Sequence, residues 1–82
     1  MELFTERLKR LRIARNMSQR RLAELIGIDH RAVIRFEEGS GKPRFESLRA
    51  MARHLHVSID YLMTGHESPH AGLYRAISPN KD

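Results

Sequence analysis

Apolar residues recur every three or four positions through residues 2–65, which is the spacing of helices that each bury one face. Five stretches show this pattern, and their apolar positions are Phe4, Leu8, Leu11, Ile13 and Ala14; Leu22, Ala23, Leu25 and Ile26; Val33 and Phe36; Phe45, Leu48, Ala52 and Leu55; and Ile59, Leu62 and Met63. The pattern therefore predicts an all-α domain of five short helices.

Capping residues mark the ends of these predicted helices. Ser18, Asp29 and Ser58 each precede an apolar stripe, where a side-chain oxygen can accept a backbone N–H of the first turn. Gly27 and Gly39 follow two of the stripes, where glycine favours the left-handed conformation that ends a helix. Residues 40–43 are then expected to form a loop.

Residues 66–82 have a different composition, with two prolines and few apolar side chains. We interpret them as a C-terminal extension to a domain that spans residues 1–65. Two interpretations stay open, namely a disordered tail or an arm whose apolar residues pack on a second subunit. The residues that would anchor such an arm are Leu73, Tyr74 and Ile77.

The third predicted helix has two distinct faces. On a helical wheel Ala32, Val33 and Phe36 fall on one side, and the opposite side carries His30, Arg31, Ile34, Arg35 and Glu38. Arginine can donate two hydrogen bonds to guanine in the major groove of DNA, and histidine can bond a base edge. Isoleucine can contact a thymine methyl group. The candidate base-reading residues are therefore His30, Arg31, Ile34 and Arg35.

The second and third predicted helices are joined by a short turn that contains glycine, as in a helix-turn-helix unit. The pairs Ser18-Gln19, Leu22-Ala23, Gly27-Ile28 and Phe36-Glu37, together with residues 57–62, resemble the Cro/C1-type (XRE-family) helix-turn-helix regulators of phages and bacteria. The resemblance covers about residues 4–65. It implies a compact five-helix DNA-binding domain of the lambda-repressor type that acts as a homodimer on a palindromic operator. Residues 30–38 would be the recognition helix.

The resemblance also implies roles for residues outside the recognition helix. Gln19 matches a glutamine that bonds a DNA phosphate, and Ser40, Lys42 and Arg44 match a loop that grips the DNA backbone. Arg12 and Glu37 match an ion pair that ties the first helix to the third. This chain departs from the family at Asp29, often Ser or Thr there, at Ile34, usually polar, and at Glu38, often basic or an amide.

Other charged and apolar residues have less specific signals. Arg20 and Arg21 are either phosphate contacts or a solvated face of the second helix, and we favour contact for Arg20. We expect the basic residues of the first helix to be a solvated face; these are Arg7, Lys9, Arg10 and Arg15. Contacts with a second subunit are expected from the fifth helix and the extension, through Tyr61, Leu62, Met63, Leu73, Tyr74 and Ile77.

Composition narrows the class of protein. The 82 residues include 15 Lys and Arg against 10 Asp and Glu, a formal charge of +5 that suits a polyanion but also aids solubility. The absence of cysteine excludes disulfides and thiolate metal sites. The chain has no apolar run near the roughly 20 residues that span a bilayer. Its start has no signal-peptide pattern, so we expect a cytoplasmic protein without membrane contact.

Catalysis and metal binding find no support in the pattern. His54 and His56, or His66 and His70, are too few ligands for a zinc site. No nucleophile, base and acid stand on a framework that could enclose a substrate. We therefore expect no enzyme, no metal and no cofactor.

The leading hypothesis is a transcriptional regulator that binds a double-stranded DNA operator, with repression as the simplest mechanism. Restriction–modification controllers are similar in size, and they activate as well as repress. RNA polymerase would be a further partner of such a regulator. The alternative is an antitoxin-like or co-regulator module whose helix-turn-helix docks a protein, such as a toxin.

Overall fold

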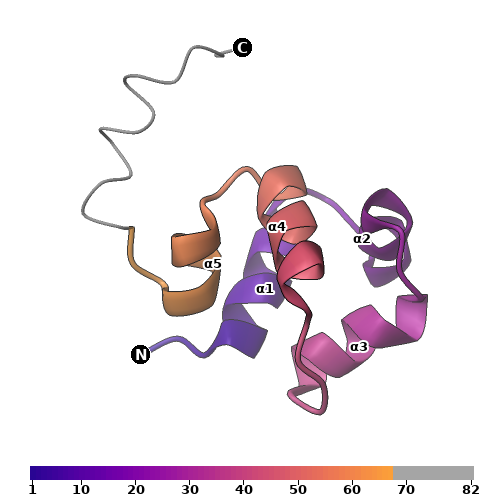
Figure 1. The fold of residues 1–82 in the computed structure, drawn as a ribbon, viewed down its shortest axis with the longest axis horizontal. Coiled ribbons are helices and arrows are strands. Elements are labelled where there is room, and N and C mark those ends of the chain that lie inside the picture. The colour runs from indigo at the N-terminus through magenta and orange to yellow at the C-terminus, as the bar shows by residue number, and fades with distance from the viewer. Residues whose placement is uncertain (68–82) are drawn as a thin grey trace.

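The computed structural model describes residues 1–67 and places five helices in them (Figure 1). They are α1 (Phe4–Ala14), α2 (Gln19–Ile26), α3 (His30–Glu38), α4 (Phe45–His54) and α5 (Ile59–Thr64). Within this part of the chain no strand occurs, so the all-α, five-helix prediction is confirmed. In Figure 1, α1 and α4 lie at the centre, with α2 and α3 to one side and α5 to the other.

Side-chain caps begin three of these helices at the predicted residues. The Ser18 hydroxyl oxygen accepts the backbone N–H of Arg21 at 2.9 Å, and that of Ser58 accepts the N–H of Tyr61 at 2.9 Å. A carboxylate oxygen of Asp29 caps α3 in the same way. Gly27 ends α2 with φ of +76°, a left-handed conformation that glycine adopts without strain. These local signals account for the tight turn between α2 and α3.

The core is formed by apolar side chains from every helix. Its fully buried members are Leu8, Leu22, Val33, Met51, Leu55 and Leu62. Two residues of the predicted stripes lie outside it, because Ile13 is 54% exposed and Phe45 is 63% exposed. Ile13 follows Leu11 by two positions and so points to another side of α1. Phe45 is the first residue of α4, and Met51, which the stripe omitted, takes a buried position deeper in the helix.

The prediction that Leu62 contacts a second subunit is wrong. Its side chain has no exposed surface and belongs to the core between α5 and its neighbours. Tyr61 is half-buried against the same core, and Met63 is 50% exposed. The other predicted contacts lie outside the described residues, and these are Leu73, Tyr74 and Ile77.

Arg7 is buried, and the prediction that it belongs to a solvated face is wrong. Its guanidinium donates to the carbonyl oxygens of Leu62 at 2.9 Å, Met63 at 3.1 Å and Glu2 at 3.1 Å. The first two carbonyls lie in the last turn of α5, where a helix has no further N–H groups to bond them. Arg7 therefore joins α1 to α5 and satisfies the end of that helix.

Replacing Arg7 by Met should lower the free energy of unfolding by about 2–4 kcal/mol, because the change leaves buried carbonyls without donors. Urea denaturation followed by circular dichroism measures this loss. The control is Lys9→Met, which removes the same charge from an exposed position of the same helix and should change stability by less than about 0.5 kcal/mol. Equal effects of the two changes would contradict the role assigned to Arg7.

Candidate nucleic-acid interface

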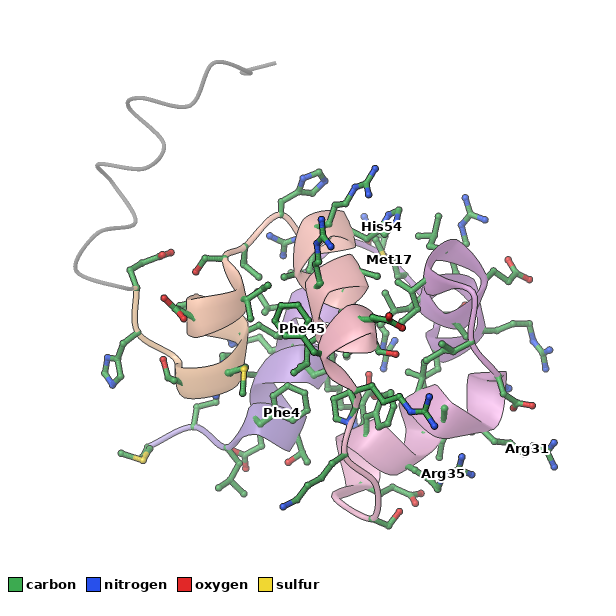
Figure 2. All side chains as sticks on the ribbon, viewed as in Figure 1. Phe4, Met17, Arg31, Arg35, Phe45 and His54 are labelled. Carbon is green, nitrogen blue, oxygen red and sulfur yellow. The ribbon has the colours of Figure 1, made fainter. Side chains whose placement is uncertain are left out.

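Helix α3 turns one face to the core and the other to solvent. Val33 and Phe36 anchor it, with exposed fractions of 0% and 8%. Arg31 and Arg35 are exposed; Figure 2 shows Arg31 extending away from the body of the protein, whereas the Arg35 side chain lies beside the loop at Gly41. His30 and Ile34 also lie on α3 but are half-buried. The outer face of α3 is therefore a basic ridge held in place by an apolar base.

Asp29 and Arg31 form a pair at the start of this ridge. Asp29 Oδ1 accepts the backbone N–H of Arg31 at 2.7 Å. The same carboxylate accepts from the Arg31 side chain, with Nε–Oδ1 and Nη2–Oδ2 distances of 3.3 Å. The hydrogen bond from the Arg31 side chain, aided by the backbone bond, lowers the pKa of Asp29 below its ordinary value. Sequence reasoning assigned Asp29 only the cap and missed its contact with a candidate base-reading side chain.

Arg12 and Glu37 form the ion pair that the family resemblance implied. Arg12 Nε donates to Glu37 Oε2 at 2.7 Å, and Nη2 donates to Oε1 at 3.0 Å. The two side chains are 9% and 4% exposed. Arg12 Nη1 also donates to the carbonyl oxygen of Met17 at 2.6 Å. The pair therefore links α1, the following turn and the last turn of α3 in a largely dry environment.

Gln19 joins this ion pair at the first residue of α2. Its Nε2 donates to Glu37 Oε1 at 3.0 Å, and its side chain is half-buried. A side-chain amide nitrogen has two hydrogens to donate, so the bond to Glu37 uses one and leaves the other. Glu37 thus orients the residue that the resemblance assigned to a DNA phosphate. The sequence did not reveal this link, because the two residues are on different helices.

The loop after α3 lies directly against that helix. A Cβ atom at Gly41 would come within 3.3 Å of Arg35 Cβ, so a residue without a side chain permits the close approach. The loop and α3 border an open groove of about 420 Å³. Its lining combines apolar, basic and acidic side chains, namely Ile28, Ala32, Arg35, Phe36, Lys42, Arg44, Glu46 and Ser47, with Gly41.

The start of α4 borders this groove, with Glu46 in its first turn. Arg44 is the N-cap residue, and its side chain makes no capping hydrogen bond, unlike the caps of α2, α3 and α5. The free N–H groups of a helix N-terminus attract anions. Arg44 and Lys42 are exposed beside them, as is Ser40. Arg20 is exposed on α2.

Between residues 1 and 67, no group of three or more His, Asp or Glu side chains is placed to hold a metal ion. No helix in the same part of the chain is long and apolar enough to cross a bilayer.

A family model described as helix-turn-helix matches residues 8–62, which include all of α2, the turn and α3. The chain belongs to this helix-turn-helix family. Its match extends beyond the two central helices to α4 and most of α5, so the family assignment covers most of the described fold.

Relatives of this helix-turn-helix protein are named as regulators. The transcriptional activator BcrR of Enterococcus faecalis is 38% identical over 64 residues, which are 78% of this chain and 31% of BcrR. This chain spans less than two thirds of the curated relatives it matches.

Two solved structures share the fold. One is the P22 c2 repressor in complex with a synthetic operator, 29% identical with a TM-score of 0.77, which covers 80% of this chain and 100% of that one. The other is a transcriptional regulator from Listeria innocua, 34% identical with a TM-score of 0.70, which covers 79% of this chain and 60% of that one.

Glu37→Gln should lower the free energy of unfolding by about 2–4 kcal/mol, because it leaves the buried Arg12 guanidinium without its counter-ion. Thermal and urea denaturation measure the change. Glu38→Gln removes the same charge from the exposed neighbouring position and should have an effect below about 0.5 kcal/mol. A Glu37 variant as stable as the Glu38 variant would show that the ion pair contributes nothing.

Proposed function

We propose that this chain binds double-stranded DNA in a sequence-specific manner and regulates transcription, with α3 in the major groove. The observation that carries the proposal is the outer face of α3, where Arg31 and Arg35 are exposed opposite the buried Val33 and Phe36. Arginine side chains on a rigid helix suit the acceptor pairs of guanine. The likeness to a repressor solved with its operator supports the same function.

Contacts with the DNA backbone would flank the reading helix on both sides. Gln19 and Arg20 begin α2 on one side, and the loop that carries Ser40, Lys42 and Arg44 lies on the other. Phosphate contacts of this kind set the register and orientation of a protein on the duplex. The uncapped start of α4 beside Lys42 and Arg44 supports an anion contact at the loop.

A homodimer would read two half-sites with one copy of α3 each. Recognition helices in such dimers lie about 34 Å apart, on successive turns of one face of the DNA. The exposed Met63 and the half-buried Tyr61 would provide contacts between copies; both belong to α5, which lies on the side of the molecule away from α3 (Figure 1). A cytoplasmic location follows from this function.

Occupancy of an operator would repress a promoter that overlaps it. The P22 c2 protein is named a repressor and BcrR an activator, so members of the family act in both directions. An activating role for this chain would add a contact with RNA polymerase. If α3 instead docked a toxin or another protein, replacing the arginines on its outer face would leave the affinity for DNA unchanged.

Selection from random duplex DNA at about 150 mM salt should enrich an inverted repeat, with half-site centres about one helical turn apart. Sequencing of the retained pool checks this expectation. Bulk binding that depends on salt but enriches no sequence would contradict a specific operator. An enriched single half-site without a repeat would contradict the dimer.

Arg35→Ala and Lys42→Ala should weaken DNA binding in different ways. The arginine change should reduce binding of the selected site by about 1–3 kcal/mol and relax the preference at one base position. The lysine change should weaken all sequences alike and reduce the salt slope by about one. Fluorescence anisotropy at several salt concentrations measures both, and unchanged affinity for both variants would favour the protein-docking alternative.

A further inference from the structure

We propose that Asp29 is a specificity-determining residue, which holds the Arg31 guanidinium in the orientation that reads guanine. This inference rests on the proposed function, since it requires α3 to enter the major groove. It goes further by assigning one base and by giving a role to an acidic residue at the start of the recognition helix.

The contacts between the two side chains leave a defined part of Arg31 free. Asp29 accepts from Nε and Nη2 at 3.3 Å each, and these two nitrogens form the side edge of the guanidinium. Arginine has five N–H donors in a planar fork. Those left over include one on Nη1 and one on Nη2 that point in parallel from the end of the side chain. That pair matches the O6 and N7 acceptors of guanine.

The carboxylate that orients Arg31 is itself held in place. Asp29 Oδ1 accepts the backbone N–H of Arg31 at 2.7 Å, which fixes the side chain to the first turn of α3. The helix N-terminus also favours a negative charge there. The Arg31 side chain is 78% exposed, so without this anchor it would sample many rotamers. Ordering the side chain before binding reduces the entropy lost when DNA binds.

Capping alone does not explain an aspartate at this position. Ser18 and Ser58 cap α2 and α5 with a hydroxyl, and within residues 1–67 neither hydroxyl hydrogen-bonds an arginine side chain. Asp29 therefore does more than a serine would do.

The test compares the base preferences of four proteins on one random duplex library at about 150 mM salt. They are the unchanged full chain, Asp29→Ser, Arg31→Ala and, as a control, Glu38→Gln. Serine keeps the helix cap, and Glu38→Gln removes an equal charge from the other end of α3. The thermal midpoint of each protein is measured first. Asp29→Asn, which also caps, is the substitute if the serine variant is unfolded.

We expect the unchanged chain to enrich guanine at one position of each half-site, and Arg31→Ala to abolish that preference. Asp29→Ser should lower the ratio of guanine to other bases there by about three- to tenfold, with its thermal midpoint unchanged. Glu38→Gln should leave the ratio as it is. Asp29→Ser and Glu38→Gln each remove a negative charge, which should raise the affinity for all DNA sequences alike. The test is therefore decided by the ratio of guanine to other bases and not by the affinity.

A full guanine preference in Asp29→Ser would overturn the inference and leave the proposed function standing. A guanine preference that survives Arg31→Ala would also overturn it. Failure of the unchanged chain to enrich any sequence would instead remove the proposed function, on which the inference rests.

Discussion

The position of α3 depends on one buried carboxylate. Glu37, in the last turn of the helix, bonds Arg12 of α1 through both of its oxygens and accepts from Gln19 of α2. A charge taken out of water must be paired and hydrogen-bonded, so this carboxylate tolerates only an arrangement that brings all three helices together. The apolar contacts of Val33 and Phe36 hold α3 against the core, and the hydrogen bonds of Glu37 fix the position of α3 relative to α1 and α2.

The same arrangement places three kinds of contact around the outer face of α3. Arg31 and Arg35 extend from a helix whose opposite side is packed, so their backbone positions are defined before any ligand binds. Gln19 is oriented by the residue that fixes α3, which couples a candidate phosphate contact to the recognition helix. The loop that carries Lys42 lies close to α3 because Gly41 has no side chain. A rigid support of this kind is what a base-reading surface requires.

Much of the fold could be predicted because its signals are local. Helical periodicity and the caps at Ser18, Asp29 and Ser58 depend on residues within one or two turns, and they located all five helices of residues 1–67. The two faces of α3 followed from the same periodicity. The pair of Arg12 with Glu37 came from the family resemblance and not from the local pattern.

By itself the sequence determined the helices, their ends and the faces that each helix offers, because these follow from spacing and from neighbouring hydrogen-bond donors and acceptors. Tertiary structure decided which polar side chains are buried. Arg7 donates a hydrogen bond to the carbonyl oxygen of Leu62 at the end of α5, more than fifty residues away in the sequence. A pattern of side chains cannot indicate such a bond, because its acceptor is a backbone carbonyl. Leu62 itself was assigned to a surface because a short amphipathic helix does not reveal which neighbour covers it. The contacts of Gln19 likewise arise only where separate helices meet.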